Sequence, residues 1–280
     1  MVTELREAVA AARDRGERIG LVPTMGAFHE GHLSLVRRAR ERCDFVVVTL
    51  FVNPTQFNDA GDLARYPRDE ARDAELAASA GADVMFAPPV NEVYPSGFST
   101  LVEVRGVSAP LEGVVRGPEH FRGVATVVTK LFNMARPDDA FFGQKDAQQA
   151  LLIRRMVRDL DIPVRIEVCP TVREADGLAM SSRNALLAPE ARQRAPVLYE
   201  ALAMVASLVD ERVHVDDALA RARAFLAGHG VVPEYFAAVS TDTLATVPAV
   251  EGETLVAIAA RFGTVRLIDN ILLHPPERRT

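Results

Sequence analysis

Two histidines three residues apart, His29 and His32, carry the strongest chemical signal in the chain. They follow a short apolar segment (19–22) and precede a segment with the periodicity of a helix (33–42). Residues three apart project to the same side of a helical turn, and helix N-termini attract phosphate. Two imidazoles there can donate hydrogen bonds to phosphate oxygens. Packing would explain either histidine alone, but the pair predicts a site that handles phosphate.

The glycines that bracket this pair form neither of the common nucleotide-binding loops. Gly31 is followed by His32-Leu33, where a Walker A loop requires Lys and then Ser or Thr. No G-x-G-x-x-G follows a predicted strand, which counts against dinucleotide binding. Gly26 and Gly31 instead allow the backbone to approach another backbone or a ligand closely.

A second polar segment, residues 143–149 (GQKDAQQ), opens a predicted helix just beyond another strand. Lys145 can meet a phosphate as a point charge, Asp146 can accept from ribose hydroxyls, and Gln149 can bond a small polar substrate. An ordinary helix start with Asp146 as N-cap explains the segment equally well.

Two loops add further polar groups. Residues 180–184 (MSSRN) combine two hydroxyls with a guanidinium, which suit the β- and γ-phosphates of a nucleotide, and such a loop could close over ATP. Taken alone, this loop is better explained as a solvated linker. Residues 53–57 (NPTQF) follow the second predicted strand, so their amides point to the same sheet edge as the histidines, although a turn built on Asn-Pro would explain them too.

The composition indicates a folded globular protein that we expect in the cytoplasm. Of 280 residues, 49% are hydrophobic and 25% charged, with a net charge of −6 and no segregation of the basic residues. We therefore expect no nucleic-acid surface, and no apolar run approaches the ~18 to 20 residues of a membrane span. Cys43 and Cys169 are too few for a thiolate metal cluster and are expected to pack in or near the core.

Helices and strands alternate in the first part of the chain, which predicts an α/β fold with a Rossmann-like parallel sheet over residues 1–172. A smaller α+β domain is expected over residues 173–280, with a hairpin turn at 261–264. The expected strands are 19–22, 45–52, 84–87, 140–142, 164–168, 235–239, 255–260 and 265–273. The expected helices are 3–18, 33–42, 68–81, 121–135, 146–160, 189–211 and 215–228, with loops at 53–61 and 173–184.

These motifs resemble a known family. His29-x-Gly31-His32 looks like the HxGH signature of class I aminoacyl-tRNA synthetases and nucleotidylyltransferases, and residues 180–183 resemble a variant of the KMSKS loop of that superfamily. A longer ordered set of strings, from about residue 19 to 187, resembles the pantothenate synthetases (pantoate–β-alanine ligases). The strings are VPTMGAFHEGHLSLV, FVNPTQF, DLARYPR, HFRGVATVVTKLFN, FGQKDAQQ and GLAMSSRN.

The resemblance implies a reaction. ATP, pantoate and β-alanine would give pantothenate, AMP and pyrophosphate through a pantoyl adenylate, with Mg²⁺ screening the polyphosphate. Residues 1–172 would bind ATP and pantoate, and residues 173–280 would carry the KMSKS-like loop. The family is generally homodimeric, so a second copy of the chain is an expected partner.

The resemblance also implies roles for single residues. The catalytic residues would be His32, acting as a proton donor, together with His29, Lys145 and Arg183. The ATP-binding residues would be Pro23, Thr24, Met25, Gly26, Ala27, Phe28, His29, Glu30, Gly31, His32, Gly143, Gln144, Lys145, Asp146, Val172, Met180, Ser181, Ser182 and Arg183. Pantoate and β-alanine would be bound by Asn53, Gln56 and Gln149, and Asp73 would lie near Mg²⁺.

Three features depart from the family pattern. Residues 116–121 (RGPEHF) are one residue longer than the usual R-P-G-H-F, Gln144 stands where Glu is common, and residues 58–61 are less typical. The nearest alternative function is a nucleotidylyltransferase acting on a phosphorylated acceptor. It would share the HxGH signature but would leave FVNPTQF and KDxQQ without an assigned role.

Overall fold

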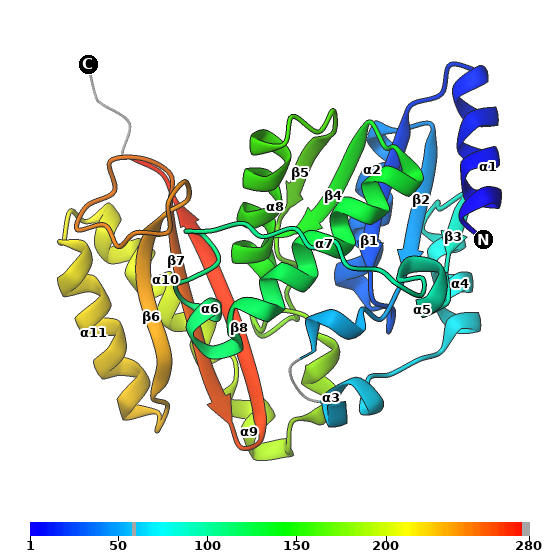
Figure 1. Ribbon diagram of the computed structural model, residues 1–280. Helices are drawn as coiled ribbons and strands as arrows, with labels where there is room; N and C mark the ends of the chain where they lie inside the picture. The colour runs from blue at the N-terminus through cyan, green and yellow to red at the C-terminus, as the bar shows by residue number, and fades with distance from the viewer. Residues whose placement is uncertain (58–59, 276–280) are drawn as a thin grey trace. The chain divides into compact units, whose positions relative to one another are not determined.

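The computed structural model describes residues 1–57 and 60–275. It divides into two compact units (Figure 1). The first unit comprises Met1–Gln144 and Gln148–Pro170, and the second comprises Lys145–Ala147 and Thr171–Thr280. Residues 58 and 59, part of the less typical loop noted above, lie outside the described residues.

The first unit is built on a five-stranded sheet in the order β3-β2-β1-β4-β5, with every neighbouring pair parallel. The predicted Rossmann-like α/β fold is therefore confirmed. Continuous β-branched runs such as that of β2 are typical of strands buried on both faces. The strands are β1 (Ile19–Thr24), β2 (Phe45–Leu50), β3 (Val84–Phe86), β4 (Asp139–Gly143) and β5 (Arg165–Cys169).

Helices cover both faces of this sheet. On one face, α2 packs against β1, β2 and β4, and Val22, Val48 and Phe141 form a buried cluster with Val36 of that helix. Leu21 of β1 and Val47 of β2 alternate with these residues along their strands and are also buried. They lie on the opposite face of the sheet, where α1 and α7 contact β1. The helices are α1 (Val2–Asp14), α2 (Glu30–Arg42), α3 (Ala60–Arg65), α4 (Glu70–Ser79), α5 (Val90–Val93), α6 (Glu112–Arg116), α7 (Pro118–Ala135) and α8 (Ala147–Asp159), with 3-10 turns η1 (Pro54–Gln56) and η2 (Gln144–Asp146).

Several helix boundaries differ from the predictions for local reasons. The first helix ends at Asp14 rather than residue 18, because Gly16 takes a left-handed conformation (φ +78°) that stops it. The helix expected at 121–135 begins at Pro118, which stands in the first turn, where its missing N–H costs nothing. The short helices α3, α5 and α6 were not predicted, since each has too few turns to show periodicity.

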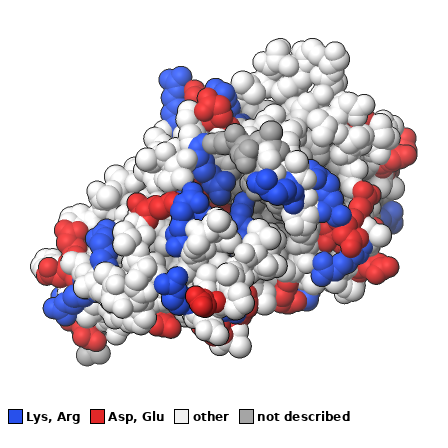
Figure 2. Space-filling view, turned by 90° about the horizontal axis from the view of Figure 1, so that it is seen from below, with Lys and Arg blue, Asp and Glu red and all other residues white. Residues whose placement is uncertain are grey.

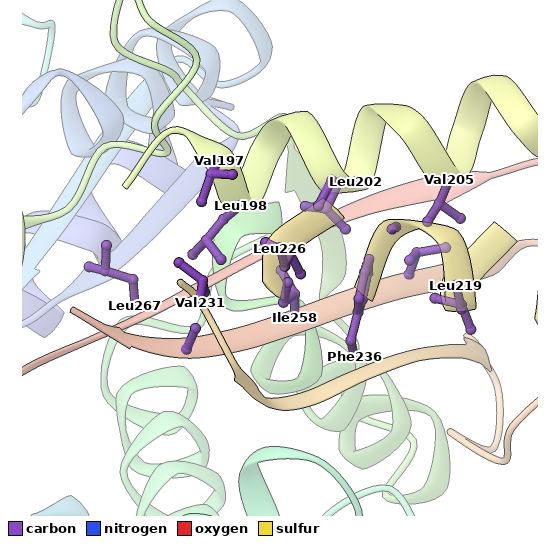
Figure 3. Packing of buried hydrophobic residues seen from close by; sticks show 14 of the residues in the cluster. Val197, Leu198, Leu202, Val205, Leu219, Leu226, Val231, Phe236, Ile258 and Leu267 are labelled. Carbon is purple, nitrogen blue, oxygen red and sulfur yellow. The ribbon is translucent and has the colours of Figure 1, made fainter. Parts of the chain in front are cut away.

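The second unit pairs helices with a three-stranded antiparallel sheet in the order β6-β7-β8. Figure 3 shows side chains of α10 and α11, such as Leu202 and Leu226, meeting Phe236 and Ile258 of the strands in one buried cluster. This confirms the predicted α+β character. The elements are η3 (Ser182–Leu186), α9 (Pro189–Arg194), α10 (Val197–Asp210), α11 (Val215–Gly228), β6 (Pro233–Ser240), β7 (Thr254–Phe262) and β8 (Val265–Leu273).

Two details of this unit bear on the predictions. The single helix expected at 189–211 is divided at Pro196, which has no N–H to donate within a helix. The hairpin expected at 261–264 is confirmed, with Phe262 paired to Val265 and Gly263 at φ +62°. No helix in the described ranges is both long and apolar enough to cross a membrane. Lys and Arg are interspersed with Asp and Glu on the face shown in Figure 2.

Candidate active site

The carboxyl ends of β1, β2 and β4 lie at one edge of the parallel sheet. The register pairs Thr24 with Leu50 and Leu21 with Ala140, so Gly143 ends its strand level with Thr24. Ligands of open α/β folds bind at this edge. The segments beginning at Met25, Phe51 and Gln144 therefore leave the sheet side by side, as the sequence predicts for the polar residues that they carry.

His29 and His32 face each other at the start of α2, with ring centroids 4.2 Å apart. His29 is the N-cap of the helix, and its Nδ1 accepts a hydrogen bond from the backbone N–H of Gly31 at 3.1 Å. A ring nitrogen that accepts carries no proton, so the neutral His29 imidazole holds its proton on Nε2. The helix start thus fixes the tautomer in which Nε2 is the hydrogen-bond donor of His29.

The turn before this pair is held by buried side chains. Thr24 Oγ1 donates to the carbonyl of Thr49 at 2.5 Å and accepts from the N–H of Gly26 at 3.3 Å. Asp73, on α4, is fully buried and accepts from the N–H groups of Ala27 and Phe28. Asp73 was expected to lie near Mg²⁺, but both of its carboxylate oxygens already accept hydrogen bonds from the backbone.

Asn53, expected to bind substrate, is only 1% exposed. Its Oδ1 accepts from the hydroxyl of Tyr94 and from Thr55 Oγ1, both at 2.9 Å, and its Nδ2 donates to the carbonyl of Gly123 at 3.2 Å. Burial raises the pKa of Tyr94, which keeps the hydroxyl protonated as a donor. The geometry therefore favours an indirect role in which Asn53 shapes the turn that carries half-buried Gln56.

Helix α7 supports the same turn. His120 Nδ1 contacts the carbonyl oxygen of Gln56 at 2.8 Å, and because a carbonyl only accepts, Nδ1 is the donor. A Cβ on Gly123 would lie 2.4 Å from the carbonyl oxygen of Thr55, so only glycine allows this approach. The sequence assigned no role to His120 or Gly123, although both lie in the string HFRG.

The adjacent glutamines of GQKDAQQ have different environments. Gln148 is buried, accepts from the N–H of Glu112 at 3.0 Å, and donates to the carbonyls of Val107 and Pro110 at 2.9 and 2.8 Å. It therefore anchors the segment before α6. Gln149 is half-buried and projects about 100° further round the helix than Gln148, so it does not share that anchoring role.

Lys145 and Asp146 belong to the second unit. Lys145 Nζ lies 3.6 Å from Asp146 Oδ1, and the backbone carbonyl of Lys145 accepts from Asn270 Nδ2 at 3.0 Å. The last strand, β8, thereby fixes the backbone that carries the lysine. Nothing in the sequence linked Asn270 to this segment, because the two are 125 positions apart.

Residues 172–180 form a small hairpin, where the sequence predicted a loop. Arg173 pairs with Ala179 across it, and Met180 donates to the carbonyl of Val172 at 2.9 Å. Arg173 also makes a bidentate ion pair with buried Asp269, at 2.6 and 3.0 Å, and stacks on the ring of Tyr199. These contacts tie the start of the predicted phosphate-binding loop to the core of its unit.

The end of that loop is fixed by a polar network. Asn184 Nδ2 donates to Glu174 Oε1 at 2.7 Å and to the carbonyl of Ala179 at 3.1 Å. Ser181 caps the 3-10 turn η3 by accepting from the N–H of Arg183 at 3.3 Å. Arg183 forms no ion pair with any described residue and is half-buried.

Almost the whole chain matches one family of known proteins. The model of the pantoate-beta-alanine ligase family matches residues 1–272. The chain belongs to this family. A pantothenate synthetase of Cereibacter sphaeroides (strain ATCC 17029 / ATH 2.4.9) is 55% identical over 271 residues, which are 96% of this chain and 97% of the relative. One from Moorella thermoacetica is 52% identical over 275 residues, covering 98% and 97%.

Solved members of the ligase family share the fold. Pantothenate synthetase from Thermus thermophilus superimposes with a TM-score of 0.92 at 47% identity, covering 98% of each chain. A pantoate-β-alanine ligase from Francisella tularensis, crystallised in complex with beta-gamma ATP and β-alanine, gives a TM-score of 0.78 at 34% identity, covering 96% of this chain and 95% of that one. The family resemblance inferred from the ordered strings is thus confirmed.

Proposed function

We propose that this chain condenses pantoate with β-alanine, converting ATP to AMP and pyrophosphate through a pantoyl adenylate. The observation that carries the proposal is the match to the ligase family over residues 1–272. The solved relative complexed with beta-gamma ATP and β-alanine supports the choice of these two substrates. The physical logic is that a carboxylate is a poor electrophile, and transfer of AMP to it supplies a good leaving group.

In the first half-reaction, a carboxylate oxygen of pantoate attacks the α-phosphorus of ATP. A bond forms between that oxygen and the phosphorus, and the bond from the phosphorus to the oxygen that bridges to the β-phosphate breaks. Negative charge builds on the non-bridging oxygens, where His29 Nε2–H and His32 are assigned as hydrogen-bond donors. The tautomer of His29 supports this, since Gly31 occupies the other nitrogen.

In the second half-reaction, the amine of β-alanine attacks the acyl carbon of the adenylate. The carbon–nitrogen bond forms, the bond from carbon to the AMP oxygen breaks, and the amine loses a proton to solvent. His32 is assigned as the catalytic proton donor to the leaving groups. Its backbone N–H donates to the carbonyl of His29 at 2.8 Å, which keeps it in the first helical turn beside its partner.

We assign the remaining residues to the substrates by their chemistry. Gln56 and Gln149 bind pantoate through their amides, and Asn53 acts by shaping the turn of Gln56. Lys145 and Arg183 neutralise phosphate charge. ATP contacts are assigned to residues 23–32, Gly143, Gln144 and Asp146, to Val172 and Met180 beside the adenine, and to Ser181 and Ser182 at the outer phosphates.

Mg²⁺ is assigned to the phosphates of ATP, and not to a protein cage. Mg²⁺ keeps several waters and commonly binds through substrate phosphates. The described residues contain no group of three or more His, Cys, Asp or Glu side chains arranged to hold a metal. Asp73 does not fit the ion, because both of its oxygens accept backbone N–H groups in a fully buried place.

Four further assignments rest on the family resemblance. The chain acts as a homodimer in the cytoplasm, residues 1–172 bind ATP and pantoate, and residues 173–280 contribute the KMSKS-like loop. Analytical ultracentrifugation tests whether the chain is a homodimer, and a monomer that turns over at the full rate would contradict this assignment.

The decisive experiment measures pyrophosphate release from ATP, Mg²⁺ and pantoate, with and without β-alanine, and identifies the product by mass. Multiple turnovers only with β-alanine, together with a pantothenate mass, are expected. A product that retains the nucleotide would instead identify a nucleotidylyltransferase. No reaction with pantoate would contradict the proposed substrate.

A further inference from the structure

A carboxylate lies buried beneath the turn that leads into the histidine pair. Asp73 comes from α4, outside the HxGH segment, and its side chain is completely shielded from solvent. Its Oδ2 accepts from the N–H of Ala27 at 2.7 Å, and its Oδ1 accepts from the N–H of Phe28 at 2.8 Å. Each oxygen thus takes one backbone donor of the turn.

The turn has a backbone conformation that needs such support. Gly26 and Ala27 both take left-handed conformations, with φ of +86° and +55°. For a residue with a Cβ, such as Ala27, this costs roughly 1–2 kcal/mol, and it persists only where the surroundings enforce it. Successive N–H groups in such a turn converge into an anion-binding concavity. Here the anion is Asp73 of the chain itself.

Gly26 is required by the same contact. A Cβ at this position would lie 2.9 Å from Asp73 Oδ2 and 3.2 Å from Cγ of Leu50. The absence of a side chain at Gly26 therefore allows the turn to approach Asp73. The N–H groups of Ala27 and Phe28 are directed at this carboxylate, so the imidazoles, and not these amides, are the donors suited to phosphate.

The direction of the two imidazoles follows from the turn. His29 directly follows Phe28, whose side chain is 3% exposed and belongs to the core cluster around α2. The ring of His32 lies 5.4 Å from that of Phe28 and 4.2 Å from that of His29. A displacement of residues 27 and 28 would move both imidazoles relative to the end of β1.

We infer that Asp73 is a positioning residue for the adenylate-forming step, acting by clamping residues 26–28 and so aiming His29 and His32, and that it is not a ligand of Mg²⁺. The inference rests on the proposed function, because the reaction provides the rate that is measured. Its geometric part, that Asp73 sets the direction of the imidazoles, can be tested without any turnover.

The main test compares Asp73→Asn with the wild type. The substitution keeps the shape but turns one acceptor into a donor that faces a backbone N–H. We expect kcat for pyrophosphate release to fall by roughly 10- to 100-fold, since a misplacement of about 1 Å can cost 10²-fold. The KM values for ATP and pantoate and the Mg²⁺ concentration for half-maximal rate are expected to stay near those of the wild type.

A matched control lies on the same helix. Asp69 is the N-cap of α4, is exposed, and accepts from the N–H of Arg72 at 3.1 Å. Asn is an equally good N-cap, so Asp69→Asn removes the same charge without touching the turn. Its kcat and its melting temperature should match those of the wild type.

The readout without turnover is the ¹⁵N NMR spectrum of the histidine side chains. In Asp73→Asn, the signals of His29 and His32 are expected to shift, whereas those of His214 and His229 in the second unit stay in place. If wild-type protein made no pantothenate, the proposed function would fail, but this spectrum would still decide whether Asp73 sets the histidine geometry.

Three results would overturn the inference. They are a normal kcat in Asp73→Asn, unshifted His29 and His32 signals, and a rate restored by excess Mg²⁺, which would indicate a metal ligand. If Asp73→Asn does not fold by circular dichroism, Asp73→Glu replaces it, because this change keeps the charge and both acceptor oxygens but lengthens the side chain that meets the N–H groups of Ala27 and Phe28. It should lower kcat and shift the signals of His29 and His32; failure of either expectation would contradict the clamp.

Discussion

His120 Nδ1 donates a hydrogen bond to the backbone carbonyl oxygen of Gln56 across 2.8 Å. The two residues are 64 positions apart, and the bond joins the first turn of α7 to the turn that follows β2. His120 therefore fixes the backbone of Gln56, whose side chain is expected to bind pantoate.

This relationship predicts two kinds of effect on pantoate binding. Gln56→Ala should raise the pantoate KM far more than the ATP KM, because the amide touches only pantoate in the proposed site. His120→Leu should raise the pantoate KM by about fivefold, since one net hydrogen bond contributes about 1 kcal/mol. His120→Asn should recover much of the loss, because Asn Nδ2 can replace Nδ1 as donor. Steady-state kinetics with each substrate varied check this, and equal changes in both KM values would contradict the placement.

The charge that builds on the non-bridging oxygens of the α-phosphate should make His32 and Lys145 essential to turnover. His32→Ala and Lys145→Ala are each expected to lower kcat by roughly 10²-fold or more. His214→Ala is the matched control, because His214 stands at the start of α11 and its side chain makes no capping hydrogen bond. Near-normal rates in both site variants would refute the assigned roles.

Gly123 should tolerate no side chain. In Gly123→Ala the new Cβ would meet the Thr55 carbonyl oxygen at 2.4 Å, so the turn or α7 must move, at a cost of about 1–3 kcal/mol in the free energy of unfolding. Gly228→Ala is the control, since no atom lies within 4 Å of its added Cβ. Urea denaturation measures both, and equal stability of the two variants would show that the close approach has no energetic weight.

Asp139 should make stability depend on pH in the acid range. Burial raises the pKa of Asp139, but hydrogen bonds from Arg18 and Arg165 outweigh it and hold the pKa below its ordinary value. The ionised side chain therefore stabilises the fold above about pH 4, and this stabilisation is lost as the pH falls through the lower folded-state pKa. Asp139→Asn should cost about 1–3 kcal/mol at pH 7. The difference from the wild type should shrink below about pH 4; a difference that stays constant down to about pH 2 would contradict the shift.

The two cysteines should be chemically inert in the folded protein. Burial raises the pKa of Cys43 to about 12 and that of Cys169 to about 11, so both remain thiols at neutral pH. Iodoacetamide at about pH 7.5 should modify neither in the native state and both in guanidinium chloride, as read by mass spectrometry. Rapid alkylation of either native thiol would show that it is more accessible than its burial indicates.

The sequence predicted the sheet, and suggested the residues of the proposed site, because both depend on local patterns. Apolar runs of strand length, helical periodicity and the spacing of His29 and His32 are properties of neighbouring residues. The parallel sheet then follows from the alternation of elements, and its carboxyl edge brings the segments after β1, β2 and β4 together without further information.

The shortest helices and the hairpin at 172–180 were not predicted from the sequence. Helices α3 and α6 are too short to show a period, and the hairpin at 172–180 is anchored by the pair of Arg173 with Asp269, 96 positions away. The split of the predicted helix 189–211 at Pro196 was visible in the sequence, whereas the anchoring of Lys145 by Asn270 was not.

The sequence by itself therefore determined the fold class, the family and the polar side chains that we propose for the site. Only the tertiary structure decided how those side chains are held. Asp73 and Asn53 carry polar groups that suit a ligand, yet both are buried and bonded to backbone or neighbouring side chains. A residue type states which hydrogen bonds a side chain can make, but the packing of distant segments decides which partners reach it first.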